Sequence, residues 1–191
     1  TKSSSILIQG SRALISSALA FSLMTVCVKH LGGRLPVAEI LFARALISLA
    51  ITQFLLKKAG ISPWGKNKGL LFVRGLLGTG ALYCFFHALA KLPLGSATVL
   101  QYTYPTFTAI SAWIILKEKI RRRIMIAVLI GWIGVTIIAK PEWITKGDGG
   151  LPLFQVFIAL TGAFLTAIAY VCVRKLSKTE HPLVIIYYFP L

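Results

Sequence analysis

The sequence has 191 residues, of which 57% are hydrophobic and 14% are charged, and its mean hydropathy is +0.80. These values exclude an ordinary water-soluble globular protein. The 21 Lys and Arg against 5 Asp and Glu give a formal charge of +16, which suggests nucleic-acid binding in a soluble protein but cytoplasmic loops in a membrane protein. Cys27, Cys84 and Cys172 lie far apart in apolar surroundings, so neither a disulfide framework nor a thiolate metal motif is present.

Apolar stretches long enough to cross a hydrocarbon layer of about 30 Å recur along the chain with short polar breaks between them. They cover about 11–29, 38–56, 69–90, 95–117, 124–139 and 151–173, and a seventh begins at about 183. None of them has the alternating pattern of a barrel strand. The sequence therefore predicts an all-α, polytopic membrane helical bundle with six complete helices and the start of a seventh.

Basic residues predict how this bundle is oriented, because Lys and Arg accumulate in cytoplasmic loops. Of the 21 Lys and Arg residues, fifteen lie in alternate breaks, beginning with the N-terminal one, and five lie in the opposite breaks. This count assigns Arg74 to the break before the third span. We therefore expect the N-terminus in the cytoplasm, and the charge needs no nucleic-acid partner. In this interpretation the 121–123 arginine run is a topology anchor, and Lys29 is an anchor at the membrane interface.

An internal repeat divides the chain. The residues VCVKHL at 26–31 and VCVRKL at 171–176 align, and Pro36 matches Pro182 with one extra residue between. Five helices separate the two copies, and an odd number reverses direction across the membrane, so we expect inverted repeats with a substrate near the midplane. The first repeat would cover 1–141 and the truncated second 151–191. Because the chain starts at Thr1 and ends in an apolar run, we expect a fragment of a longer protein.

Polar residues within the spans are the candidate substrate pathway, because each is costly in hydrocarbon and tends to face protein or water. In the fourth span they follow helical spacing along one face: Thr98, Gln101, Tyr104, Thr108 and Ser111. Pro105 lies near the middle of that span and offers no N–H to the carbonyl of Gln101, which predicts a kinked helix with a hinge. The alternative is that the hydroxyls join neighbouring helices and that the proline only bends the chain.

The second and third spans contribute three further candidates. Tyr83 and His87 share one face of the third span and would line the same cavity, or would belong to a polar cluster at the helix end. Arg44 lies roughly 10 Å inside the second span at 1.5 Å per residue, where its guanidinium suits a carboxylate or phosphate of the substrate. It could equally extend to the interface or pair with an acid outside this chain. Glu39 is a poor partner for Arg44, because five positions correspond to about 140° round a helix.

The sequence lacks the groups of reactive residues that a membrane enzyme would need. Asp and Glu do not occur near the middle of any span, and His, Cys, Asp and Glu do not group with the spacing of a metal site. We therefore predict no catalytic residues, no metal and no cofactor.

Several motifs together resemble the drug/metabolite transporter superfamily, and within it the EamA-like transporters. They are Lys29 at the end of the first span, PVAEILFAR at 36–44, ALAKLPLGSA at 88–97, PTF at 105–107, LKE at 116–118 and GWIG at 131–134. The resemblance implies a carrier of ten helices in two inverted five-helix repeats, with both ends in the cytoplasm and a central cavity lined by both halves. It implies small metabolites or drugs as substrates.

We therefore expect a secondary transporter that works by alternating access and is not an enzyme. Its partners would be a small-molecule substrate and the lipid bilayer of the plasma (inner) membrane, and we expect no nucleic acid. The sequence allows a homodimer but does not decide the oligomeric state. The alternatives are a membrane scaffold without transport and a multispanning membrane enzyme.

Overall fold

The computed structural model describes residues 2–116, 122–139 and 151–190, and this part of the chain is helical throughout its regular structure. The helices are α1 (Lys2–Leu31), α2 (Val37–Ala59), α3 (Lys68–Lys91), α4 (Leu94–Gln101), α5 (Tyr104–Leu116), α6 (Arg122–Ala139), α8 (Leu153–Leu176) and α9 (Pro182–Tyr187). Four helices are long and apolar enough to cross a membrane: α1 from Gly10, α2, α3 and α8. A fifth, α6, carries a shorter apolar stretch, Ile124–Ile137. The predicted all-α membrane bundle is confirmed at this level, and the protein is an integral membrane protein.

The fourth predicted span differs from the expectation of one kinked helix with Pro105 near its middle. The helix ends at Gln101 and a new one begins at Tyr104, which makes Pro105 the second residue of α5. Two local effects explain the break. The Thr103 hydroxyl donates to the Leu100 carbonyl over 2.7 Å and competes with the helical backbone ladder. Proline is tolerated in the first turn of a helix but removes a hydrogen bond from the interior.

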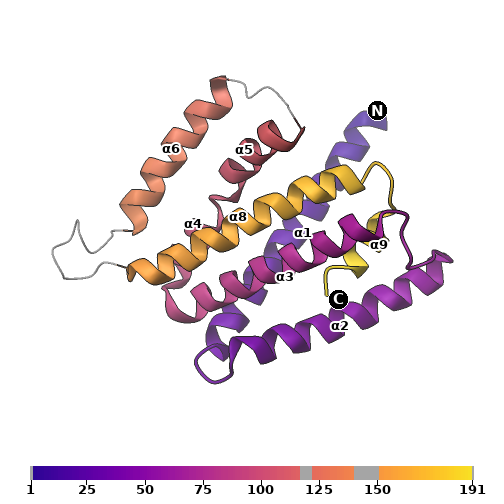
Figure 1. The fold of residues 1–191 in the computed structure, drawn as a ribbon, viewed down its shortest axis with the longest axis horizontal. Coiled ribbons are helices and arrows are strands. Elements are labelled where there is room, and N and C mark those ends of the chain that lie inside the picture. The colour runs from indigo at the N-terminus through magenta and orange to yellow at the C-terminus, as the bar shows by residue number, and fades with distance from the viewer. Residues whose placement is uncertain (1, 117–121, 140–150, 191) are drawn as a thin grey trace.

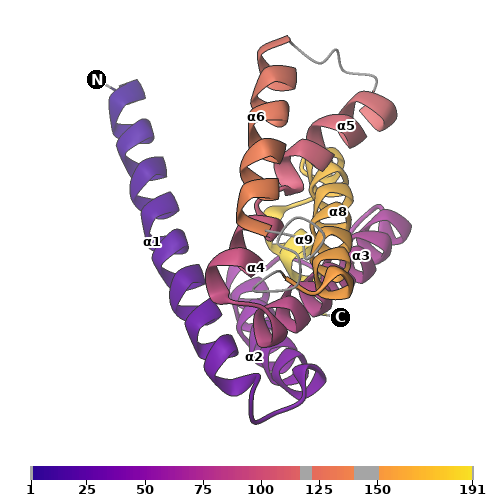
Figure 2. The same ribbon diagram turned by 90° about the vertical axis from the view of Figure 1, so that its left-hand side faces the viewer.

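The centre of the bundle is the pair α3 and α8, which lie side by side across both views (Figures 1 and 2). Small residues allow this close approach, because Ala81 on α3 and Ala163 and Ala167 on α8 are buried. A Cβ on Gly162 would lie only 2.9 Å from the Cβ of Cys84. Larger apolar residues of α3, including Phe85, Phe86 and Leu89, complete the core around this contact.

Both ends of α3 are held by side chains from other elements. At its C-terminal end, the ammonium of Lys29 on α1 donates to the carbonyl of Leu92 over 2.7 Å and to that of Ala90 over 3.4 Å. At its N-terminal end, Glu180 from the α8–α9 loop accepts the backbone N–H of Asn67 over 2.7 Å. Each contact matches the helix dipole, with a cation at the C-terminus and an anion at the N-terminus. The expectation that Lys29 is an interface anchor stays a prediction, and the structure adds that its ammonium binds the carbonyls at the C-terminal end of α3.

The two copies of the repeated motif end equivalent helices. One copy closes α1 at Leu31 and the other closes α8 at Leu176. Each is followed by a proline that opens the next helix, Pro36 before α2 and Pro182 at the start of α9. Both ribbon views show α1 and α8 running in roughly opposite directions (Figures 1 and 2).

Candidate substrate pathway

The polar stripe predicted in the fourth span lies on α4 and α5 and faces α8. The side-chain amide of Gln101 donates from Nε2 to the hydroxyl of Thr166 over 3.0 Å. The ring of Tyr104 stacks on that of Tyr170, with 5.2 Å between their centres and 17° between their planes. Ser111 is buried. Gln101 and Tyr104, which lie on either side of the helix break, therefore face α8, the helix that opens the predicted second repeat.

The residues of the stripe differ in the hydrogen-bonding capacity they have left. The hydroxyls of Thr98 and Thr108 each donate to the carbonyl four residues earlier, an ordinary way for a helix to satisfy threonine. Gln101 is different, because its amide nitrogen is bonded to Thr166 while its Oε1 is buried without a partner. A buried amide oxygen without a donor is costly. Gln101 is thus the stripe residue with the clearest capacity to bind another group.

Thr166 and Tyr170, the partners of the stripe, are residues that the sequence analysis missed. They lie four positions apart on α8 and therefore on one helical face. Polar side chains at this spacing inside the sixth apolar span were the signal that could have identified them.

Tyr83 and His87 contact each other rather than the stripe. Their rings stack with 6.3 Å between centres, and the Tyr83 side chain is 47% exposed. The predicted shared face on α3 is present, since the two residues stand one turn apart. Within the residues that the structure describes, no polar contact joins this pair to Gln101 or Tyr104, so the structure does not bring these candidates together.

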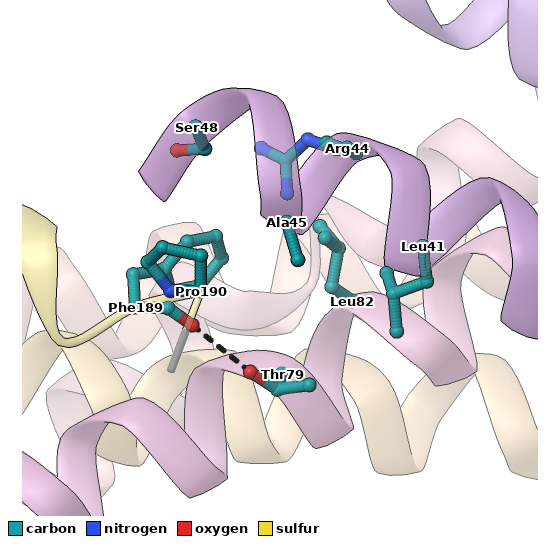
Figure 3. Close-up of a pocket in the computed structure, with 8 residues that line it drawn as sticks. All are labelled: Leu41, Arg44, Ala45, Ser48, Thr79, Leu82, Phe189 and Pro190. Carbon is teal, nitrogen blue, oxygen red and sulfur yellow. Dashed lines mark hydrogen bonds between the residues drawn. The ribbon is translucent and has the colours of Figure 1, made fainter. Parts of the chain in front are cut away.

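Arg44 lines a separate cavity of about 30 Å³ between α2 and α3. Figure 3 shows Arg44 and Ser48 on the α2 side, Thr79 and Leu82 on the α3 side, and Phe189 and Pro190 beside them. Thr79 donates from its hydroxyl to the carbonyl of Phe189 over 3.0 Å, which fixes the C-terminal residues in this place. A cavity of this volume holds a water or two but no metabolite.

Arg74 is a second arginine that the sequence analysis placed with the cytoplasmic break. The structure places it on α3, in the second turn of the helix, with its side chain half-buried. Its guanidinium lies over the ring of Phe189, 4.7 Å from the ring centre. Its position inside the predicted span 69–90 was the available signal, and counting it as a loop residue obscured this.

The described residues of the polar stripe and the Arg44 cavity do not include a group of metal-ligating side chains. In residues 2–116, 122–139 and 151–190, no three His, Cys, Asp or Glu side chains gather as a metal site would need. The polar groups near the stripe and the cavity are amides, hydroxyls, phenols and guanidiniums, which bind and orient small molecules through hydrogen bonds.

Comparison with known proteins decides the family. The sequence model of the EamA-like transporter family matches residues 9–140, which is more than half of the chain. The chain belongs to the EamA-like transporter family. This confirms the resemblance to the drug/metabolite transporter superfamily, and the family and its named relatives are transporters rather than enzymes.

Three relatives indicate the range of this family. The pseudopaline exporter CntI of Pseudomonas aeruginosa is 31% identical over 92% of this EamA-like chain and 60% of its own length. Solute carrier family 35 member G1 of Mus musculus is 31% identical over 92% of this chain and 50% of its own. The S-adenosylmethionine uptake transporter of Rickettsia prowazekii is 29% identical over 80% of this chain and 51% of its own length. The chain therefore spans about half to three-fifths of the length of these relatives. No solved structure shows a significant match.

Proposed function

We propose that the complete protein containing this chain is a secondary transporter that moves a small metabolite or drug across the membrane by alternating access. The observation that carries the proposal is the polar face of α4 and α5, which lies against α8 with the buried Oε1 of Gln101 unpartnered. Substrates of inverted-repeat carriers bind near the midplane, where the two halves meet. Relatives named as an exporter and as an uptake transporter support transport and leave its direction open.

The proposed architecture is two inverted five-helix repeats, ten helices in all. Residues 1–141 would form the first repeat and 151–191 the start of the second. The opposite directions of α1 and α8 support this arrangement (Figures 1 and 2). With the charge distribution, it gives a cytoplasmic N-terminus in the plasma (inner) membrane.

Within this proposal, Gln101 and Tyr104 bind the substrate between α4, α5 and α8. Thr108 and Ser111 extend the same face along α5, whereas Tyr83 and His87 form a second polar patch on α3. Pro105 is the hinge, because it stands at the break between α4 and α5 and has no N–H to add to the backbone hydrogen bonds there.

Transport by the reconstituted complete protein is the direct test. Proteoliposomes loaded with amino acids, S-adenosylmethionine or pseudopaline should exchange at least one of these solutes in a saturable counterflow assay. Protein-free liposomes are the control. A protein that is folded by size-exclusion chromatography but exchanges none of a broad metabolite panel would favour the membrane scaffold instead.

Cysteine accessibility tests the location of the pathway. In a background without Cys27, Cys84 and Cys172, cysteines at Gln101 and Tyr104 should react with a membrane-impermeant thiol reagent, because thiolate forms only where water reaches. Cysteines at Ile110 and Ile114 are the matched controls. These positions are 41% and 63% exposed, more open than the stripe, yet we expect them to face lipid and to stay unreactive. The reverse pattern would make the stripe a packing surface.

A further inference from the structure

Two arginines from different helices converge on one aromatic ring. The guanidinium carbon of Arg44 on α2 lies 5.4 Å from the centre of the Phe189 ring, and that of Arg74 on α3 lies 4.7 Å from it. At 1.5 Å per residue, Arg44 stands roughly 10 Å from the start of α2 and Arg74 roughly 9 Å from the start of α3. The two helices are consecutive and antiparallel (Figure 1). The start of α2 and the start of α3 therefore lie at opposite ends of the helix pair, and each arginine reaches the ring from its own end.

Neither guanidinium has a counter-charge in the part of the chain that the structure describes. The Nε and Nη1 atoms of Arg74 are buried without a hydrogen-bond partner. The described acids are Glu39 and Glu180. Glu180 is bonded to the backbone of Asn67, and Glu39 stands on the first turn of α2, about 140° round the helix from Arg44. Burial of guanidinium nitrogens without an anion or a hydrogen-bond partner is unfavourable even in a half-buried side chain, so such a residue commonly marks a site whose partner is a ligand.

The packing around the pair is compatible with a binding site. A Cβ on Gly78 would lie 2.5 Å from Nη1 of Arg74 and 2.6 Å from the Phe189 ring, so glycine makes room for the guanidinium beside the ring. The hydroxyls of Ser48 and Thr79 line the adjoining cavity (Figure 3). Guanidinium groups and hydroxyls together are the donors that carboxylates and phosphates accept from.

We propose that Arg44 and Arg74 together bind the carboxylate or phosphate group of the transported substrate, which makes that substrate an anionic small molecule. This assignment rests on the proposed transport function. The aromatic face of Phe189 partly compensates the two cations by cation–π contact, and charge-assisted hydrogen bonds to an anion are stronger. Because the cavity of about 30 Å³ is too small for a metabolite, Phe189 and Pro190 must withdraw when the anion enters.

Binding of simple anions to the complete protein tests the proposal without knowledge of the natural substrate. The protein is placed in phosphatidylcholine nanodiscs, and equilibrium binding of radiolabelled inorganic phosphate and citrate is measured at constant ionic strength in chloride. We expect saturable binding of at least one of them. Arg44→Gln and Arg74→Gln should each weaken it by about tenfold or more, and Arg74→Lys should restore part of it. Arg122→Gln, at the exposed start of α6, is the matched control and should bind like the wild type.

A second measurement guards against loss of binding by misfolding. Removing a half-buried charge whose Nε and Nη1 atoms lack partners should leave the melting temperature of the Arg74→Gln protein equal to or above that of the wild type. Saturating phosphate or citrate should raise the melting temperature of the wild type but not of the Arg44→Gln, Arg74→Gln double variant. Wild-type binding in both single glutamine variants, or no binding of either anion by the wild type, would overturn the anion site.

Two further measurements distinguish a lipid headgroup from a free anion as the ligand, and failure of the anion site from failure of the transport function. If phosphatidylglycerol in the nanodisc binds through the arginines while free phosphate and citrate do not, the ligand is a lipid headgroup and the substrate assignment is wrong. If transport of a metabolite proceeds unchanged in both glutamine variants, the proposed function stands and the anion site fails. If anion binding depends on the arginines but no solute is transported, the arginines bind an anion, but the transport function fails and the substrate assignment fails with it.

Discussion

At the scale of single residues, the placement of polar groups follows from the cost of leaving them unpaired in hydrocarbon. Threonines of the stripe bond to their own helix, whereas Gln101 reaches across to Thr166 and retains a free oxygen. The sequence spacing predicted which side chains share a face. It could not predict this difference, because the difference depends on the residues that α8 brings opposite.

A pair of substitutions separates binding from packing at Gln101. Gln101→Leu and Thr166→Val remove the same interhelical hydrogen bond, which is worth about 0.6 kcal/mol on average in membranes. Thr166→Val should lower stability by at least this amount because it leaves the Gln101 amide nitrogen unpaired, whereas Gln101→Leu should lower it less because it also removes the unpartnered Oε1. Only Gln101→Leu also removes the free acceptor. We expect it to raise the KM of transport several-fold more than Thr166→Val does, as measured by counterflow in proteoliposomes. Equal effects of the two variants on transport would assign Gln101 to helix packing.

At the scale of elements, α3 organises the bundle through close contact with α8 and through polar groups bound at both of its ends. Small residues set the distance between the two helices, because van der Waals packing drives helix association in lipid. The end contacts come from α1 and from the α8–α9 loop, far away in sequence. The position of α3 is thus fixed by elements of both predicted repeats.

Gly162→Ala tests the close contact. An alanine Cβ would lie 2.9 Å from the Cβ of Cys84 and 3.3 Å from the Ala81 carbonyl oxygen, so the helices must separate. We expect a cost of about 1–3 kcal/mol, larger than the gain of about 0.5–1 kcal/mol from replacing glycine in a helix. Gly131→Ala on α6 is the control, because nothing lies within 4 Å of its added Cβ. Thermal unfolding in detergent should show opposite shifts for the two variants, and a stabilised Gly162→Ala protein would contradict the contact.

Glu180→Ala tests the contact at the start of α3. Loss of the hydrogen bond to Asn67 should allow the α2–α3 loop to open locally, where the exposed Lys66 and Lys68 flank that residue. Local stability lowered by about 1.4 kcal/mol would speed trypsin cleavage there roughly tenfold, if cleavage follows the open population. Inside-out vesicles make the loop accessible, and Glu39→Gln at the start of α2 is the control. Unchanged cleavage in Glu180→Ala would show that the carboxylate does not hold this loop.

At the scale of the whole molecule, the unequal distribution of basic residues and the proposed inverted repeat predict the same topology. If successive membrane spans alternate in direction, the basic breaks are predicted to fall on one side of the membrane. The Glu180 and Asn67 contact joins two breaks that this rule assigns to the same side, and the topology prediction agrees with that pairing.

Reporter fusions test the orientation directly. A reporter fused after Lys146 should behave as extracytoplasmic, and one fused after Lys178 should behave as cytoplasmic, because the proposed topology places the basic breaks on the cytoplasmic side. Alkaline phosphatase and green fluorescent protein give opposite signals at each position. An inverted pattern at both positions would reverse the proposed orientation and would leave the helix boundaries intact.

The sequence by itself determined the class of the protein, because hydrocarbon allows few solutions. Apolar runs of membrane length must be helices, so the expected spans agree within a few residues with α2, α3, α6 and α8 and with the apolar part of α1 from Gly10, although α1 itself begins at Lys2. The family followed from motifs such as PVAEILFAR and ALAKLPLGSA, which a local reading can recognise.

The tertiary structure alone decided which polar residues meet. It divided the fourth span at Thr103, placed Gln101 and Tyr104 against α8, and separated Tyr83 and His87 from them. It also brought Arg74 to the same aromatic ring as Arg44. Helical spacing states which residues share a face, but what lies opposite that face depends on packing between segments 30 to more than 100 residues apart. That packing is set by small residues and helix-end contacts with no local signature.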